Sequence, residues 1–281
     1  MWLESDLVKR WLAGKDAFDA GVASLAALAA RPGVVGIKIA DELGYQDGLD
    51  SASKIQSFLV DSGTALHRAA PGKLLLVDML VPELGCLPDY TPSPPAASAC
   101  AADQRAKYPE LELSQIDGYL RAHVIDVLDL STNLQTANIY ADWGVDSSTA
   151  QRAGWQEARR RGWDRLVRLQ ARKALAHPGA YPGTDADARA ALTTYVDIPR
   201  EMGASAVDVW TWRQLYQGEI YRLIDPGLRS NPLWAGLVAR HTAGARLFTH
   251  LSPHSLEQDL QTDLNMVAQV FTDLFVAAGT G

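Results

Sequence analysis

The stretch VVGIKIADE, residues 34–42, is a short and nearly continuous apolar run that ends in two carboxylates. Helical patterns separate it from further runs of the same kind. Those runs are KLLLVD (73–78), VIDVLDL (124–130), KALAH (173–177) and AVDVWTW (206–212). Short apolar strands between helices are typical of a parallel sheet that is buried on both faces. The sequence therefore predicts an α/β fold with about five parallel strands.

The segments between and beyond these strands have the spacing of amphipathic helices. The clearest is at the C-terminus, where apolar residues recur at steps of four and three from Leu256 to Leu274. The chain before residue 34 also has a helical pattern. We expect helices over residues 18–30, 51–70, 147–171, 185–202, 234–251 and 256–274.

The distance between strands limits the architecture. The five runs begin near residues 34, 73, 124, 173 and 205, whereas a complete barrel of eight βα units spends about 31 residues on each unit. We therefore expect one domain over residues 1–281, an incomplete TIM-like barrel with about five parallel strands and seven or more helices. An open doubly wound sheet is the alternative, but it usually has a glycine-rich loop after its first strand, which is absent here.

Composition excludes several kinds of partner. Lys and Arg number 26 against 33 Asp and Glu, and the resulting net charge of −7 repels the phosphate backbone of nucleic acids. No window of about 18 uninterrupted apolar residues is present, so we expect no membrane span. We expect no cofactor, because the sequence has neither a P-loop nor an HExxH motif. We also expect no metal site, because His250 and His254 are separated by Pro253 and lack a third ligand.

The two cysteines, Cys86 and Cys100, flank a loop rich in Pro, Ala and Ser. A disulfide between them would stabilise this loop by about 3 kcal/mol, and we favour it over two unrelated thiols. Structural disulfides belong to oxidising compartments. Because residues 1–6 do not have the character of a signal peptide, we expect a secreted or cell-surface protein whose leader is absent here. A cytoplasmic protein is the alternative.

Polar residues follow each predicted strand. In a parallel barrel these strand ends share the face where substrates bind. Carboxylates there suit glycosidic bond cleavage, which needs one carboxylic acid to protonate the leaving oxygen and one carboxylate as nucleophile or base. Aromatic rings such as Trp212 and Tyr45 could stack on sugars. The strand-end residues are Asp41, Glu42, Asp78, Glu83, Asp129, His177, Trp212 and Arg213.

Two of the runs resemble strands of a known group of enzymes. Residues 36–43, GIKIADEL, are similar to the fourth strand of clan A glycoside hydrolases, which ends in Asn-Glu with that Glu as general acid/base. Residues 208–213, DVWTWR, are similar to the eighth strand of the same barrels, which often carries a sugar-stacking Trp. The resemblance implies that Glu42 is the acid/base and that Trp212 binds sugar. We predict Arg213 as a further sugar ligand.

The sequence departs from that group in two respects. Asp41 stands where those enzymes have Asn, and the strand equated with their seventh ends in LAHPG, residues 175–179, without the Glu that is their nucleophile. Only 33 residues precede the first predicted strand, which is too few for three βα units. The resemblance therefore implies a barrel without its first three strands, with an open side that the terminal helices or another subunit would cover.

Each candidate residue also has a structural interpretation. Glu42 is either the acid/base or a salt-bridge partner in a loop, and Asp41 is either a substrate ligand or a helix cap. We predict Asp78 or Asp129 as the second carboxylate, with hydrogen-bonded structural roles as the alternative. His177 is either a substrate-binding base that replaces the missing carboxylate or an ordinary loop residue. Structural roles are favoured for the aspartates inside strands, Asp126 and Asp208.

These observations lead to one preferred function and two alternatives. The preferred function is glycoside hydrolase-like, acid/base cleavage of glycosidic bonds. The first alternative is a non-catalytic pseudoglycosidase that binds a glycan or a protein partner through the same cleft. The second is a structural module whose open barrel side docks another subunit or a second copy in a homodimer. An enzyme needs two carboxyl groups about 5 Å or about 6.5–9.5 Å apart on the open face, whereas a docking module exposes a large apolar patch.

Overall fold

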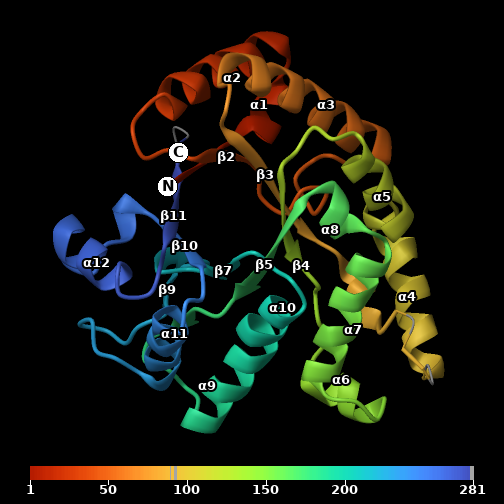
Figure 1. Cartoon of the computed structure of the whole chain (residues 1–281), viewed down its shortest axis with the longest axis vertical. Coiled ribbons are helices and arrows are strands. Elements are labelled where there is room, and N and C mark those ends of the chain that lie inside the picture. Colours follow the sequence, from red (N-terminus) through yellow and green to blue (C-terminus); the bar gives the residue numbers. More distant parts are fainter. Residues whose placement is uncertain (89, 92–93, 279–281) are drawn as a thin grey trace.

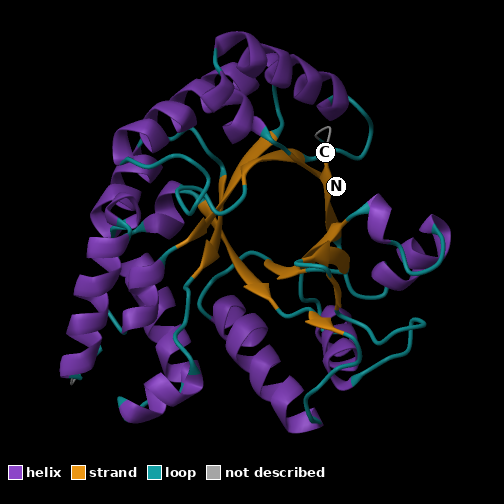
Figure 2. Ribbon diagram, turned by 180° about the vertical axis from the view of Figure 1, so that it is seen from behind, coloured by secondary structure: helices purple, strands orange, loops and turns teal. Residues whose placement is uncertain are grey.

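Eight parallel strands close into a barrel in the computed structural model, which describes residues 1–88, 90–91 and 94–278 (Figures 1 and 2). Helices surround the ring of strands on its outer side. In order around the ring, the strands are β1 (Trp2–Glu4), β2 (Gly36–Ala40), β3 (Leu74–Leu80), β4 (Val127–Ser131), β5 (Arg168–Ala174), β7 (Val207–Trp210), β10 (Leu247–Leu251) and β11 (Asp273–Ala277).

The ring closes because β1 lies between the last and the second strand. Trp2 is in register with Phe275 of β11 on one side and with Gly36 of β2 on the other. The β11 strand in turn pairs with β10. The predicted α/β barrel is therefore confirmed, but the prediction of an incomplete barrel with five strands was wrong. No side of the described ring is left open for another subunit to cover.

The three strands that the sequence analysis missed are short. They have three residues in β1 and five each in β10 and β11. Their apolar residues also fit a helical spacing, which is why they were assigned to helices. The expected helix over 234–251 ends at Thr242, and the expected helix over 256–274 is helical only over Leu260–Val267. The strands that resemble the fourth and eighth of clan A barrels are the second and the sixth of this one.

The helices of the outer layer follow the predicted order. The expected helix over 51–70 is confirmed as α3, which begins at the Ser51 cap, whose side chain accepts a hydrogen bond from the Lys54 N–H. The expected helix over 147–171 ends at Arg160 instead, because a left-handed Gly162 breaks it before β5. The helices are α1 (Leu7–Ala13), α2 (Lys15–Ala29), α3 (Ala52–Ala69), α4 (Pro95–Lys107), α5 (Leu113–Arg121), α6 (Ala137–Asp142), α7 (Ser147–Arg160), α8 (Trp163–Leu166), α9 (Asp185–Leu192), α10 (Ile198–Glu201), α11 (Pro232–Thr242) and α12 (Leu260–Val267), with short turns η1 (Pro82–Cys86), η2 (Pro109–Leu111), η3 (Thr193–Asp197) and η4 (Pro253–Ser255).

Three short strands add an antiparallel extension after the sixth barrel strand. Strands β8 (Arg213–Tyr216) and β9 (Glu219–Arg222) form a hairpin, and β6 (His177–Pro178) pairs with β9. The strand expected over 173–177 is thus divided: its first part belongs to β5, and His177 belongs to the extension. The extension follows the C-terminal end of β7, so it lies beside the barrel mouth.

The barrel interior has two layers of different character. The lower layer is apolar, with Trp2 packed against Phe248 and Phe275 at ring distances of 6.3 and 6.2 Å. The side-chain period of a strand is two, so residues two positions further along face the same interior. Those positions are polar. They hold Glu4, Lys38, Asp78, Asp129, Asp208 and His250, which follow Trp2, Gly36, Leu76, Val127, Ala206 and Phe248.

The predicted disulfide is confirmed. Cys86 at the end of η1 is joined to Cys100 in α4, with the two Cα atoms 5.6 Å apart. The bond therefore fixes α4 to the loop that leaves β3. Within the described residues, no helix is long and apolar enough to cross a membrane.

Candidate active site

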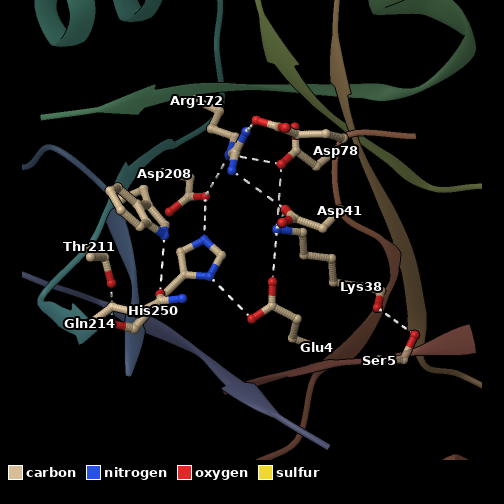
Figure 3. A network of polar contacts seen from close by, with 12 residues as sticks. Glu4, Ser5, Lys38, Asp41, Asp78, Arg172, Asp208, Thr211, Gln214 and His250 are labelled. Atoms are coloured by element: carbon tan, nitrogen blue, oxygen red, sulfur yellow. Dashed lines mark hydrogen bonds and ion pairs between the residues drawn. The ribbon is translucent and has the colours of Figure 1, made fainter. Parts of the chain in front are cut away.

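Lys38 is the centre of one half of the polar layer. Its side chain is fully buried, and its Nζ lies 3.1 Å from Glu4 Oε1, 2.6 Å from Asp41 Oδ1 and 3.5 Å from Asp78 Oδ2 (Figure 3). Burial alone would lower the pKa of Lys38, but the carboxylates outweigh it and raise that pKa well above its usual value. Lys38 is therefore an ammonium ion that ties together the first three strands.

Arg172 of β5 organises the other half. Its Nε lies 2.8 Å from Asp78 Oδ2, and its Nη1 donates a hydrogen bond of 2.8 Å to Glu42 Oε1. Its Nη2 lies 3.5 Å from Asp41 Oδ1. One guanidinium thus holds carboxylates from two strands that are far away in the sequence. Glu42 has a positive φ of 47°, a conformation that is costly for a residue other than glycine, and in this turn its side chain accepts the hydrogen bond from Arg172.

His250 of β10 lies between two carboxylates. Its Nδ1 is 3.2 Å from Glu4 Oε2, and its Nε2 is 2.9 Å from Asp208 Oδ2. Burial lowers the pKa of His250, but Asp208 and Glu4 outweigh burial and raise it to about 9. Burial likewise opposes the ionisation of Glu4, yet Lys38 and His250 lower its pKa to about 2. His250 is therefore an imidazolium ion at neutral pH, and Glu4 is a carboxylate.

Asp129 of β4 has a different environment. Its side chain is fully buried, and neither carboxyl oxygen has a hydrogen-bond partner among the described residues. It is in register with Asp78 on one neighbouring strand and with Gln170 on the other. Burial raises the pKa of Asp129 well above its usual value, and the nearby Asp208 and Asp78 raise it further. Burial also raises the pKa of Asp78, against the pull of Arg172 and Lys38.

The depth of the carboxyl groups divides the site into a rim and a floor. At the rim, the side chains of Asp41, Glu42 and Glu4 are 53%, 35% and 24% exposed. At the floor, Asp78 and Asp129 are fully buried. A ligand that approaches the mouth therefore meets Asp41, Glu42 and Glu4 first, and the two carboxyl groups whose pKa values burial raises lie beneath them.

Two groups of aromatic rings flank the rim. The hairpin rings are Trp210, Tyr216 and Tyr221, whose centroids lie 5.5–5.8 Å apart. The loop rings are Tyr45 and Tyr108, 5.2 Å apart. A hydrogen bond with Tyr108 is the first cause that raises the pKa of Tyr45 to about 12, and the charges of Glu42 and Tyr216 add to it. The Tyr45 N–H donates a hydrogen bond of 2.8 Å to the carbonyl oxygen of Glu42, so Tyr45 belongs to the same turn as this rim carboxylate.

The structure brings several predicted site residues together. Asp41, Glu42 and Asp78 belong to one network, Asp129 lies in register with Asp78 beside it, and Tyr45 shares a turn with Glu42. Their common position follows from the parallel strands, whose C-terminal ends meet at one face. Two other carboxylates that were considered make structural contacts. Asp126 Oδ2 accepts a hydrogen bond of 2.8 Å from the Leu75 N–H, and Glu83 Oε1 accepts one of 2.6 Å from Arg105.

Three predicted sugar ligands lie elsewhere. Trp212 is 1% exposed, packs on Trp234 and donates a hydrogen bond of 2.9 Å to Asp263, so its ring has no face free for a sugar. Arg213 is held by Glu257 at 2.7 Å and by backbone carbonyls of the η4 segment. His177 is buried against Tyr181 in the extension, apart from the network. The structure therefore places these three residues apart from the network, because each packs into its own part of the fold.

Other residues of the network were missed or given a structural role. They lie within apolar strands, where a single polar residue does not by itself indicate a functional site. Each of them except Arg172 lies two residues after a side chain of the barrel interior and therefore faces the interior too. The sequence does not say which face of each strand is interior, so this signal can be used only once the fold is known. These residues are Glu4, Lys38, Arg172, Asp208 and His250, together with Trp210 at the mouth. Within the described chain, no group of three or more His, Cys, Asp and Glu is arranged to hold a metal ion.

Comparisons with known proteins bear on the fold. No family model matches the chain, and no curated protein matches it. A probable tagatose 6 phosphate kinase from Sinorhizobium meliloti 1021 superposes with a TM-score of 0.54 at 16% identity, over 99% of this chain and 64% of that one. This chain thus spans less than two thirds of that protein.

Two further solved structures are more distant. Xylanase 10B from Thermotoga petrophila RKU-1, in complex with xylobiose, has a TM-score of 0.48 at 10% identity, over 83% of this chain and 70% of that one. The beta-glycosidase BGL167 has a TM-score of 0.48 at 13% identity, over 93% and 76%. At the identity of the kinase, structural likeness shows the fold alone: this chain shares its α/β barrel with a solved enzyme structure.

Proposed function

We propose that this protein is a carbohydrate-active protein of the glycosidase type, which acts at the C-terminal mouth of the barrel. The observation that carries the proposal is the position of Glu42: a partly exposed carboxylate at the rim, paired with Arg172, above the buried Asp129, whose pKa burial raises. Glycosidic bond cleavage requires a carboxylate and a carboxylic acid in one site.

The environments of these groups divide the two roles. Because Arg172 donates a hydrogen bond to Glu42, Glu42 is a carboxylate and suits the role of nucleophile or base. Asp78 and Asp129 lie deeper, and burial raises the pKa of both. Asp129, which has no hydrogen-bond partner among the described residues, suits the role of acid better than Asp78, which is paired with Arg172. The half-buried ring of Trp210, next to Asp208 on the same strand, takes the sugar-stacking role that was predicted for Trp212.

A non-catalytic glycan-binding protein is the second candidate, and one observation favours it. Asp78 and Asp129 are fully buried, so in this structure neither reaches a ligand at the rim. The rim carboxylates Asp41 and Glu42 are both engaged by Arg172. A mouth of this kind can hold sugar hydroxyls without the pair of accessible carboxyl groups that hydrolysis needs.

The place of action is part of the proposal. The Cys86–Cys100 bond favours an oxidising compartment, since cytosolic reductants keep thiols reduced. We therefore propose that the protein is secreted or held at the cell surface.

The experiment that tests the proposed function is hydrolysis of a panel of aryl-glycosides and polysaccharides by the wild type and by Glu42→Gln. Gln keeps the size of the side chain but removes its charge. Loss of the reacting carboxylate should lower activity by about 100-fold or more. Glu201→Gln, on the exposed surface of α10, is the matched control and should leave activity unchanged.

The outcomes separate the two candidates. Equal activity of wild type and Glu42→Gln would contradict the role of Glu42. If neither protein hydrolyses any substrate but the wild type still binds a polysaccharide, the non-catalytic candidate is the correct one. Absence of both hydrolysis and carbohydrate binding would contradict the proposed function altogether.

A further inference from the structure

The charged side chains of the barrel interior alternate between acid and base around the ring of strands. Neighbouring members are 2.8–3.9 Å apart, and the last contacts the first, so the set is closed (Figure 3). Each basic member lies between two acidic ones, and the alternation of charge is complete only when the histidine is protonated. In order, the members are Glu4 of β1, Lys38 of β2, Asp78 of β3, Arg172 of β5, Asp208 of β7 and His250 of β10.

The two contacts of His250 require a hydrogen on each of its ring nitrogens. A carboxylate only accepts hydrogen bonds, and a neutral imidazole has a single N–H. Nδ1 lies 3.2 Å from Glu4 Oε2 and Nε2 lies 2.9 Å from Asp208 Oδ2, so both contacts are hydrogen bonds only in the imidazolium. The Phe275 ring, 4.9 Å from the imidazole, adds a cation–π contact. Lys38 opposes the positive charge, but the carboxylates outweigh it, in agreement with the raised pKa of His250.

Loss of this proton leaves His250 with one N–H for two carboxylates. Asp208 is fully buried, and the other basic group near it is Arg172 at 3.9 Å. Glu4 is 24% exposed and keeps the Lys38 ammonium at 3.1 Å. An unpaired carboxylate costs more in the interior than near solvent. The remaining hydrogen therefore stays with Asp208, and the bond to Glu4 is lost.

The bond between His250 and Glu4 crosses the place where the first and last strands meet. Strand β11 lies between β10 and β1 in the ring, and it places the apolar Phe275 beneath the imidazole. His250 therefore reaches across β11 to Glu4. Strand β1 has only three residues, and Glu4 is the ionisable one among them. In the lower layer Trp2 holds β1 against Phe248 of β10; in the polar layer His250 does so.

We propose that His250 is a pH-sensitive switch: as an imidazolium it ties β1 to β10 and β7, and loss of its proton at alkaline pH loosens β1 at the barrel mouth. This inference goes beyond the proposed function and does not depend on it. Because Trp2 stays packed in the apolar layer, the loosening is confined to the end of β1 that carries Glu4. The switch therefore changes the mouth and leaves the lower end of the barrel closed.

The first test is an NMR titration of the imidazole groups of the full chain over the neutral and alkaline range. His250→Gln identifies the His250 signal, because this signal is missing from its spectrum. We expect a midpoint of about 9 in the wild type. Glu4→Gln removes one of the two carboxylates and should lower the midpoint by at least about one pH unit. His254→Gln, which replaces an exposed histidine of η4, is the matched control and should leave the midpoint unchanged.

The second test compares amide hydrogen exchange on the two sides of that midpoint, as protection relative to an unfolded chain at the same pH. The reporters are the Ser5 N–H, which bonds to the Lys38 carbonyl oxygen, and the Ala278 N–H, which bonds to that of Glu4. Above the midpoint their protection should fall by at least about tenfold, which corresponds to one lost hydrogen bond between charged groups. The amides of β4, three strands away in the ring, should keep their protection.

The variant Glu4→Gln separates a switch from a contact that is merely structural. Its amide N–H can donate to the unprotonated Nδ1 of a neutral His250, and its carbonyl oxygen can still accept from Lys38. The link between the strands then no longer needs the charge. The protection of the reporters in Glu4→Gln should therefore be the same on both sides of the wild-type midpoint. In His250→Gln, which lacks the titrating group, it should also be independent of pH.

Four results would overturn the inference. The first is a wild-type midpoint at or below about 6.5, the value of an unperturbed histidine. The second is equal protection of the reporters on the two sides of the midpoint. The third is an equal loss of protection in β4, because it would report unfolding of the whole barrel. The fourth is an undiminished loss in Glu4→Gln. None of these results depends on hydrolysis or carbohydrate binding, so the inference and the proposed function fail separately.

Discussion

Asp129 is a side chain whose environment opposes its usual charge. It is fully buried, has no hydrogen-bond partner among the described residues, and lies near two other aspartates. Its pKa in the folded protein is raised above 3.8, the value it has in an unfolded chain. Between these two pKa values the unfolded chain releases a proton that the folded protein retains, so stability falls as the pH rises.

The first prediction concerns Asp129→Asn. Asn is neutral at every pH and has nearly the shape of the protonated acid, so the variant avoids this loss. Below pH 3.8, wild type and variant should have the same pH dependence; above it, the variant should gain stability by up to about 1.4 kcal/mol per pH unit until the folded pKa is reached. Urea unfolding at a series of pH values measures this difference.

Asp126→Asn is the matched control for this prediction. Asp126 is close in sequence, but it is 38% exposed and hydrogen-bonded to the Leu75 N–H. Its replacement should give no gain that increases with pH. A loss of stability in Asp129→Asn that does not diminish as the pH rises above 3.8 would contradict the prediction, because it would mean that the folded protein does not retain the proton of Asp129.

The residues of the site were predictable only in part. Asp41, Glu42, Asp78 and Asp129 were predicted because each ends or follows an apolar strand, and the ends of parallel strands meet. Trp210 and Trp212 show the limit of this argument. They are two positions apart on one segment, yet one lies at the mouth and the other in the core beside Trp234, because the chain turns after β7. The sequence alone does not show where that turn occurs.

At the scale of elements, the disulfide connects a helix of weak amphipathic character to the barrel. In α4 only Ala97 is buried, so the helix has little apolar contact of its own. The Cys86–Cys100 bond and the ion pair between Arg105 and Glu83, 2.6 Å long, fix it against η1. Tyr108, one of the loop rings, follows directly after this helix.

The second prediction concerns the variant without the disulfide, Cys86→Ala/Cys100→Ala. Loss of the cross-link restores the entropy of the enclosed loop in the unfolded chain and should lower the free energy of unfolding by about 3 kcal/mol. Denaturant unfolding measures the loss, and hydrogen exchange should show it first in α4. Addition of a reductant should destabilise the wild type but not the variant. Equal stability of wild type and variant would contradict the prediction.

Helices and strands were predicted correctly where the segment was long enough to show its apolar period. The helix α3 was correct at both ends because a capping serine precedes a regular apolar stripe. The prediction of helix at β10 and β11 was wrong. Each strand has only five residues, which are too few to distinguish the apolar period of two of a strand from the period of 3.6 of a helix. Their identity as strands depends on pairing with each other and with β1, which are contacts between distant parts of the chain.

At the scale of the whole molecule, the closure of the barrel depends on a close approach at Gly36. A Cβ atom there would contact the buried ring of Trp2 and would lie 2.6 Å from the Leu74 carbonyl oxygen. The ring belongs to β1 and the carbonyl belongs to β3, so the three strands meet at this glycine. Neither group can move away, because the ring is packed in the lower layer and the carbonyl is backbone.

The final prediction is that Gly36→Ala destabilises the protein by about 1–3 kcal/mol, since overpacking in a core forces its neighbours apart. Gly118→Ala is the control. Gly118 lies in α5, where a Cβ would meet nothing within 4 Å, so alanine should be neutral or stabilising by up to about 1 kcal/mol. Thermal or urea unfolding of both variants measures the difference, and an equal stability of the two variants would contradict the role of Gly36 in closure.

The apolar layer lies beneath the polar one, where Trp2, Phe248 and Phe275 pack against one another at ring distances of 5.8–6.3 Å. The charged side chains of the described interior are therefore confined to the half of the barrel that faces the C-terminal ends of its strands. A ligand that binds to these charges would thus have to approach them from that end.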